Sequence, residues 1–132
     1  MSGIQIVTEF IQAWNENDLD RAHELMTEDI YYHNIPMQPI QGRENARAFA
    51  DSFGVGKRML AHWEIVNIAE RDGVVLTERI DSFTLEDGRK ISVPLMGSFR
   101  IRDGLISEWR DYFDLATFER QLAKQPGSKP HE

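Results

Sequence analysis

Residues 104–114 read Gly-Leu-Ile-Ser-Glu-Trp-Arg-Asp-Tyr-Phe-Asp, and this stretch has the alternating pattern of a β-strand. With the two-residue period of a strand, Asp111 shares one face with the apolar side chains of Leu105, Trp109 and Phe113. The other face, which suits solvent or an interface, carries Ile106, Glu108, Arg110, Tyr112 and Asp114. The strand therefore places a carboxylate where a core side chain is expected.

A second segment, residues 75–83, repeats this pattern with two charges. Its sequence Val-Leu-Thr-Glu-Arg-Ile-Asp-Ser-Phe puts Arg79 and Asp81 on one face. Buried charges are costly unless they are paired and hydrogen-bonded. Because a guanidinium has five N–H donors, Arg79 could bridge Asp81 and Asp111 within one pocket.

The order of the elements places helices before strands. Ser2 and Gln5 have the spacing of a capping box at the start of an amphipathic helix, and Asp18 is positioned to cap a short second helix. The remaining elements are expected as a strand at residues 30–33, a helix at 43–53, strands at 62–69, 74–85, 90–102 and 104–114, and a helix at 115–123. Pro94 and Gly97 indicate an edge position or a bulge, and hence curvature. We therefore expect an α+β fold with a strongly curved, mostly antiparallel sheet whose N-terminal helices close a cone-shaped pocket.

The composition limits the classes of partner. The 132 residues carry a net charge of −7, which disfavours binding to nucleic acid or to an anionic membrane. Cysteine is absent, so thiol nucleophiles and thiolate metal sites are excluded. No metal site is expected either, because no ligand spacing connects His23, His33, His62 and His131. Without an apparent signal peptide or long apolar run, we expect a cytoplasmic protein with one catalytic domain at residues 1–124 and a tail at residues 125–132.

Two inward carboxylates beside one guanidinium would give the pocket an acid and a base together. Because like charges repel at low dielectric, one carboxyl group tends to keep its proton while the other stays ionised. Tyr32 and Asn34, two positions apart, could orient a water molecule. The candidate apolar lining of the pocket is Phe83, Leu85, Leu95, Phe99, Trp109 and Phe113. Such a pocket suits a small neutral substrate that is protonated and attacked at once.

Each feature taken alone has a plainer interpretation. Arg79 and Asp81 fit a cross-strand ion pair on a solvated face, and Asp111 fits a satisfied buried acid or a helix cap. Asn34, before a proline-rich turn, is typical of turn chemistry. The sequence also lacks a Gly-rich phosphate loop and a nucleophilic-serine motif, which disfavours a nucleotide cofactor and a covalent serine mechanism.

Three segments occur in a characteristic order, namely Tyr32-His-Asn-Ile-Pro-Met37, Thr77-Glu-Arg-Ile-Asp81 and Trp109-Arg-Asp-Tyr-Phe-Asp114. Together they resemble the limonene-1,2-epoxide hydrolase family, a branch of the cone folds that include nuclear transport factor 2 and ketosteroid isomerase. The resemblance implies that Asp111 deprotonates a water molecule held by Tyr32 and Asn34. Asp81, in its protonated form, would give its proton to the epoxide oxygen while Arg79 bridges the carboxylates. It further implies a small neutral lipophilic epoxide as substrate, a homodimer and no cofactor, with His33 as a departure between the two water-holding residues.

Two other functions remain open on the same fold. A polyketide cyclase or a ketosteroid-isomerase-like enzyme would move a proton with one carboxylate and an oxyanion donor, and Arg79 would then be surplus. A non-catalytic member would bind a small ligand and would tolerate replacement of Asp81 and Asp111 by asparagine.

Overall fold

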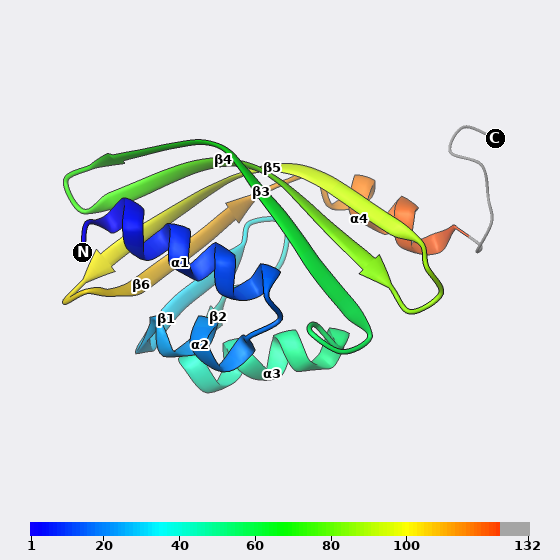
Figure 1. The fold of residues 1–132 in the computed structure, drawn as a ribbon, viewed down its shortest axis with the longest axis horizontal. Coiled ribbons are helices and arrows are strands. Elements are labelled where there is room, and N and C mark those ends of the chain that lie inside the picture. Colours follow the sequence, from blue (N-terminus) through cyan, green and yellow to red (C-terminus); the bar gives the residue numbers. More distant parts are fainter. Residues whose placement is uncertain (125–132) are drawn as a thin grey trace.

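The computed structural model describes residues 1–124, and the expected tail at 125–132 lies outside the described residues. The helices are α1 (Gly3–Asn15), α2 (Leu19–Glu24), α3 (Arg43–Phe53) and α4 (Leu115–Ala123). The strands are β1 (Met26–Asn34), β2 (Ile40–Gln41), β3 (Met59–Arg71), β4 (Val74–Leu85), β5 (Lys90–Arg102) and β6 (Leu105–Tyr112). Figure 1 shows α1, α2 and α3 packed against a strongly bent sheet, with α4 at the far end of the sheet.

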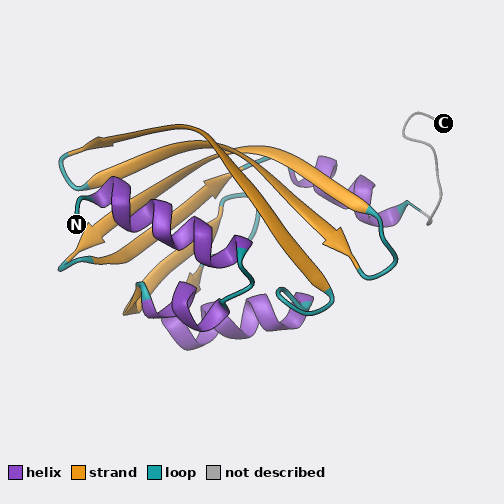
Figure 2. Cartoon of the chain, in the orientation of Figure 1, coloured by secondary structure: helices purple, strands orange, loops and turns teal. Residues whose placement is uncertain are grey.

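The sheet has the strand order β2-β1-β6-β5-β4-β3. All neighbours are antiparallel except β1 and β6, which pair in parallel. Figure 2 shows the sheet arching over α1, while α2 and α3 lie across its concave side. The predicted α+β fold, with a curved and mostly antiparallel sheet closed by N-terminal helices, is confirmed; the sheet does not close into a barrel.

Local sequence signals fix most of the element boundaries. The Ser2 side chain accepts a hydrogen bond from the backbone N–H of Gln5, and the Gln5 side chain accepts one from the backbone N–H of Ser2, which completes the predicted capping box. Asp18 caps α2 as expected. The turn from β3 to β4 has positive φ angles at Asp72 and Gly73, which is the turn type that matches the twist of paired strands.

Irregular pairing accounts for one wrong prediction on β6. Ile106, which was assigned to the outer face, is fully buried. The register between β5 and β6 shifts between Arg100 and Ile101, so Ile106 and Ser107 are buried in succession and the alternation resumes only afterwards. A period-of-two argument fails across such a shift.

The expected edge position of β5 is correct for only part of the strand. β5 lies between β4 and β6, but its pairing with β6 begins at Met96. Pro94 pairs with Ile80 of β4 and lies beyond the end of β6. No β6 residue lies opposite it, so proline's missing N–H costs no hydrogen bond to β6. β1 is also longer than the predicted strand at 30–33, because it is held by both β2 and β6.

An aromatic core lies between α1 and the concave face of the sheet. Phe10 of α1 meets Trp109 edge-on with ring centroids 4.9 Å apart, and Phe99 stacks against Trp109 at 6.0 Å. Trp14 stacks against Trp63 of β3 at 5.0 Å. These large rings fix the distance between helix and sheet, and the space that they leave becomes the cavity described below.

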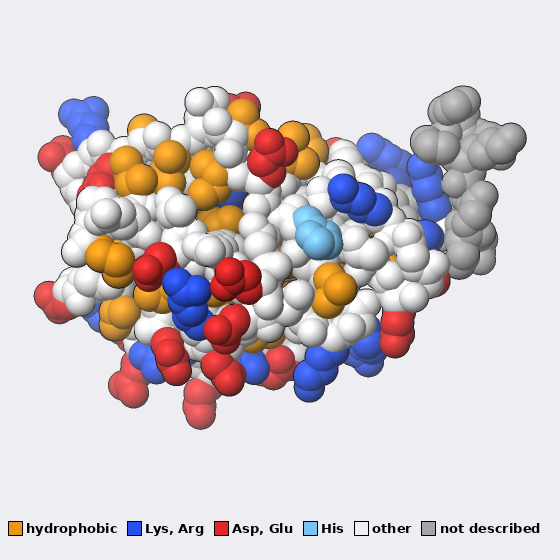
Figure 3. Space-filling view, in the orientation of Figure 1, with side chains coloured by type: hydrophobic (Ala, Val, Ile, Leu, Met, Phe, Trp, Pro, Cys, Tyr) orange, Lys and Arg blue, Asp and Glu red, His pale blue; other side chains and the backbone are white. Residues whose placement is uncertain are grey.

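Mixed charges cover the helical side of the molecule, where Figure 3 shows acidic and basic side chains gathered together. Arg21 of α2 lies 3.7 Å from a carboxylate oxygen of Glu9 and 3.4 Å from one of Glu16. Such pairs keep this surface solvated and contribute little stability each. Among residues 1–124, no helix is long and apolar enough to cross a membrane.

Candidate active site

A buried ionic group of three side chains lies on the concave face of the sheet. β4 supplies Arg79 and Asp81, and β6 supplies Asp111. The guanidinium of Arg79 donates through Nε to Oδ1 of Asp81 at 3.0 Å and through Nη2 to Oδ2 at 2.8 Å. Nη2 also donates to Oδ2 of Asp111 at 3.0 Å. These three residues are 0%, 5% and 3% exposed, so the inward orientation predicted for all of them is confirmed.

Neighbouring residues complete the coordination of this group. Nη1 of Arg79 donates to Oγ1 of Thr77 at 3.1 Å, and Nε1 of Trp109 donates to Oδ1 of Asp111 at 3.0 Å. Gly97 of β5 lies beside them, and a Cβ atom there would come within 2.4 Å of Arg79 Nη1 and 2.7 Å of Asp111 Oδ1. The sequence suggested a bulge at Gly97, but Gly97 is regularly paired with both neighbouring strands. Its missing side chain leaves the space that the guanidinium occupies.

Burial and mutual charge shift the pKa values of Arg79 and Asp81 away from their ordinary values. Burial disfavours the charge of Arg79, but the carboxylates of Asp111 and Asp81 outweigh it and raise the pKa of Arg79 above its usual value. Burial raises the pKa of Asp81 to about 6 and outweighs the lowering effect of Arg79, with the charge of Asp111 acting in the same direction as burial. Asp81 thus holds a proton more readily than an ordinary aspartate does.

The parallel pairing of β1 with β6 brings Tyr32 and Asn34 to this group. Asn34 is the direct backbone partner of Asp111, and the next backbone N–H, that of Ile35, donates to the carbonyl of Asp111 at 2.9 Å. The Tyr32 ring stacks on Trp109 at 4.1 Å. Burial, reinforced by the charge of Asp111, raises the pKa of Tyr32, so its hydroxyl group stays protonated and can donate.

His33 does not intrude between these two side chains. Its Nε2 atom lies 2.8 Å from the carbonyl oxygen of Met37, and its ring meets Tyr31 edge-on. The alternation of β1 therefore turns His33 away from the carboxylates, where it stabilises the turn after Asn34. The departure noted in the sequence does not alter the group itself.

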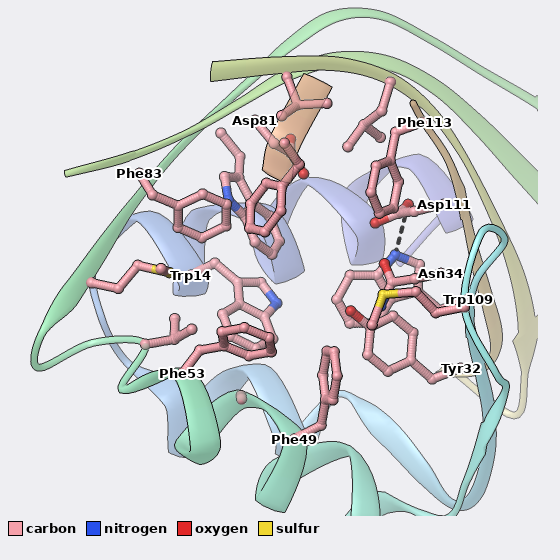
Figure 4. Close-up of a pocket in the computed structure, with 18 of the residues that line it drawn as sticks. Trp14, Tyr32, Asn34, Phe49, Phe53, Asp81, Phe83, Trp109, Asp111 and Phe113 are labelled. Carbon is pink, nitrogen blue, oxygen red and sulfur yellow. Dashed lines mark hydrogen bonds between the residues drawn. The ribbon is translucent and has the colours of Figure 1, made fainter. Parts of the chain in front are cut away.

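A cavity of about 260 Å³ opens in front of the ionic group, and Figure 4 shows Asp81, Asp111 and Asn34 at its wall. Four of the six predicted apolar lining residues do line it, namely Phe83, Leu95, Trp109 and Phe113. The prediction is wrong for the other two. Phe99 is fully buried behind Trp109 and the guanidinium, and Leu85 is only half-buried near the end of β4, outside the lining.

Other lining residues come from helices, which the strand pattern could not reveal. α3 contributes Ala46, Phe49, Ala50 and Phe53, and α4 contributes Leu115, Phe118, Glu119 and Leu122. The apolar spacing within 43–53 was the available signal for α3. Trp14, His23 and Trp63 also line the cavity. Within the described part of the chain, no three acidic or histidine side chains are grouped so as to hold a metal ion.

Comparison with known proteins identifies the family of this chain. The family model of the limonene-1,2-epoxide hydrolase catalytic domain matches residues 1–124. The chain belongs to the limonene-1,2-epoxide hydrolase family. It is 32% identical over 111 residues to the epoxide hydrolase EphG of Mycobacterium tuberculosis, an alignment that covers 83% of this chain and 71% of EphG.

Solved structures agree with the family assignment. A limonene-1,2-epoxide-hydrolase-like epoxide hydrolase from Mycobacterium tuberculosis superposes with a TM-score of 0.80 at 27% identity, covering 91% of this chain and 88% of that chain. An NTF2-like protein of unknown function from Burkholderia pseudomallei has a TM-score of 0.78 at 19% identity, with coverage of 94% and 100%, and shows the fold alone. Membership of the family supports epoxide hydrolase activity for this chain.

Proposed function

We propose that the protein is an epoxide hydrolase that adds water directly to a small lipophilic epoxide and releases a vicinal diol. The observation that carries this proposal is the bridging of two buried carboxyl groups by one guanidinium at the wall of an apolar cavity. An acid and a base are both required for one-step opening of an oxirane, and this group has one candidate for each.

Asp111 is the proposed general base. One of its oxygens accepts from Trp109 and the other from Arg79, which fixes the carboxylate toward the cavity. A water molecule between Asp111, Asn34 and Tyr32 would lose a proton to Asp111 as its oxygen attacks a ring carbon. Holding the water in this geometry lowers the entropic part of the barrier.

Asp81 is the proposed general acid. Its raised pKa keeps part of the population protonated near neutral pH, and this proton goes to the oxirane oxygen as the C–O bond breaks. After turnover Asp111 holds the proton taken from water and Asp81 has lost its own, so one proton must pass between them or through solvent. Arg79 keeps its charge throughout and stabilises whichever carboxyl group is ionised.

A single-turnover reaction in ¹⁸O-labelled water tests this mechanism. Wild-type protein in excess over a cyclohexene oxide should give diol that carries the label in the first turnover, with no mass added to the protein. Asp111→Asn and Asp81→Asn should each lower the rate by about 10²–10⁴-fold, whereas Glu108→Gln, a matched carboxylate on the opposite face of β6, should not. Unlabelled first-turnover diol, or full activity in Asp111→Asn, would refute the mechanism.

We also infer that the protein is a homodimer. The convex face of the sheet exposes four large apolar side chains, which are Leu76, Ile80, Met96 and Tyr112. Met96 pairs directly with Tyr112 across β5 and β6, so the apolar side chains adjoin one another. Light scattering after size-exclusion chromatography should give twice the chain mass, and Met96→Glu should give the monomer mass, while Thr8→Glu on α1 should not. A wild-type monomer at micromolar concentration would contradict the inference.

A further inference from the structure

Three buried polar atoms in the cavity wall have no hydrogen-bond partner among the described residues. They are Nε1 of Trp14, Nε2 of His23 and Nε1 of Trp63. The three side chains are 3%, 4% and 8% exposed, so solvent does not satisfy these atoms from outside. Because buried polar groups in folded proteins are almost always paired, three unpaired atoms on one wall of a cavity indicate a missing polar ligand.

The three side chains form one continuous wall that begins beside the ionic group. Trp63 of β3 is the backbone partner of Asp81, and its ring lies 5.6 Å from the guanidinium carbon of Arg79. Trp14 stacks on Trp63 at 5.0 Å, and His23 of α2 meets Trp14 edge-on at 5.4 Å. Figure 4 shows Trp14 across the cavity from Asp111 and Asn34. The wall thus continues from Asp81 through Trp63 and Trp14 to His23, and the Trp14 ring lies 6.0 Å from that of Trp109.

The chemistry of these atoms fixes what the ligand must offer. An indole nitrogen only donates, so Trp14 and Trp63 each need an acceptor. Nδ1 of His23 lies 2.7 Å from the carbonyl oxygen of Leu19, so it carries the proton and donates. Burial also lowers the pKa of His23, which keeps the ring neutral and leaves Nε2 as an acceptor. The wall thus needs a group that both accepts and donates.

We propose that Trp14, His23 and Trp63 form a polar subsite that binds a hydroxyl group of the substrate at a distance from the oxirane. A hydroxyl oxygen has two lone pairs, so it can accept from the indole N–H groups of Trp14 and Trp63 while its O–H donates to Nε2 of His23. A carbonyl oxygen would leave His23 unpaired. The substrate class is therefore an epoxide that carries an alcohol, held in an otherwise apolar cavity. This inference rests on the proposed function for the oxirane part alone.

Matched epoxides test the subsite by kinetics. The probes are cyclohexene oxides with an ethyl, propyl or butyl chain on a ring carbon remote from the oxirane, each beside an isostere whose terminal methyl is replaced by hydroxyl. If the cavity wall offered no unpaired polar atoms, every methyl compound would have the higher kcat/KM, because the buried hydroxyl group of its isostere would be left unpaired. We expect kcat/KM for the hydroxyl compound to exceed that of its methyl isostere by about tenfold at the chain length that reaches Trp14.

Variants show whether these atoms cause the preference. Trp14→Phe removes the N–H and His23→Leu removes the acceptor, and each should lower the hydroxyl-to-methyl ratio by about tenfold. His23→Gln, which restores an acceptor oxygen, should recover part of the ratio. Thr8→Glu, on the exposed side of α1 and outside the cavity lining, should leave the ratio unaltered. Because the two substrates are compared within each variant, a general loss of folded protein or of activity cancels from the ratio.

A binding measurement separates this inference from the proposed reaction. The chain has three tryptophans, and their indole N–H signals in a ¹H–¹⁵N spectrum can be assigned with Trp14→Phe and Trp63→Phe. Cyclohexyl-alkanols, which lack an oxirane, should shift the Trp14 signal, and the corresponding alkylcyclohexanes should not. If no epoxide reacts but the signal shifts, the subsite stands and the hydrolase proposal fails. If epoxides react but every methyl compound is preferred and no alcohol shifts the signal, the subsite binds water only and the inference is overturned.

Discussion

Two ionic trios lie on opposite faces of the same part of the sheet, and their compositions mirror one another. The buried trio consists of Arg79, Asp81 and Asp111; the surface trio consists of Glu108, Arg100 and Arg110. In the first, one cation joins two carboxyl groups, and in the second, one carboxylate joins two cations. In the surface trio Glu108 lies 2.5 Å from Nε of Arg100 and 2.7 Å from Nη1 of Arg110.

The difference between the trios shows how strongly the face of a strand decides the state of a carboxyl group. Burial raises the pKa of Asp81 to about 6 although Arg79 contacts both of its oxygens. Glu108 is partly desolvated, which raises its pKa, but hydrogen bonds from Arg110 and Arg100 prevail and lower it. Similar contacts therefore accompany a raised pKa on the concave face and a lowered pKa on the convex face.

Removal of the arginine should produce the largest contrast. Arg79→Ala strands two buried carboxyl groups, so the free energy of unfolding should fall by about 3–5 kcal/mol and hydrolysis should cease. Arg110→Ala, in the surface trio, should change it by less than about 1 kcal/mol. Urea denaturation of both variants measures the contrast. Equal losses would mean that the buried trio is solvated in the native protein.

The space left by Gly97 should be the next most sensitive feature. In Gly97→Ala the new methyl group displaces Arg79 or Asp111, because both lie closer than a Cβ atom allows. We expect hydrolysis to fall by about 10²-fold, as for other small displacements of catalytic groups. Ser98→Ala, the adjacent position facing away from the trio, is the control. Activity within twofold of wild type in Gly97→Ala would show that the guanidinium can move without consequence.

Titration of Asp81 should give the protein an unusual dependence of stability on pH. Its pKa in the folded protein, about 6, lies above its ordinary value of 3.8, so the native state binds a proton that the unfolded chain has lost between these values. Stability should therefore decline as pH rises from about 4 to about 6. The decline should disappear in Asp81→Asn, and hydrolysis by wild type should weaken above pH 6 as the acid ionises.

Urea midpoints at closely spaced pH values measure this decline. Glu108 contributes in the opposite sense, because its pKa is lowered: its share of stability is present at neutral pH and is lost as pH falls through that lowered value. A wild-type curve that rises steadily from pH 4 to pH 6, with the same shape in Asp81→Asn, would contradict the proposed protonation of Asp81.

The smallest effect is expected for the surface trio. Glu108→Gln should lower the free energy of unfolding by less than about 1 kcal/mol, because its partners remain hydrated. About 1 M sodium chloride should remove most of this difference by screening, since the pairs are partly exposed to solvent. Denaturation of wild type and Glu108→Gln at low and high salt gives the comparison. A loss that salt does not reduce would show that the surface trio is effectively buried, as at an interface.

The sequence was sufficient to predict the buried trio because the two-residue period of a strand is a local property. Arg79, Asp81 and Asp111 each stand among apolar neighbours on one face, and no knowledge of the partner strand is needed to see it. The same reasoning failed for Ile106, where a register shift interrupts the alternation. A bulge depends on the neighbouring strand, and its position is not encoded in one strand alone.

The lining of the cavity was only partly predictable, because it is a tertiary property. Phe99 was placed in the pocket by its strand face, but Trp109 and the guanidinium fill the space in front of it. The contributions of α3 and α4 depend on how these helices cross the open side of the sheet. The unpaired atoms of Trp14 and His23 could not be recognised at all without knowing which polar groups have partners.

The parallel pairing of β1 with β6 has a consequence for how the protein folds. It makes Asn34 and Asp111 direct neighbours although most of the chain separates them. Hairpins join β3 through β6 in succession, whereas this pairing requires closure of a longer loop than any other strand pairing in the sheet, and is entropically the costliest of these pairings to form. A folding intermediate with only the hairpins would have the bridged carboxyl groups but would lack Tyr32 and Asn34, the side chains proposed to hold the water. Recovery of hydrolysis during refolding should therefore lag behind recovery of strand content, which makes catalysis a reporter of the final docking step.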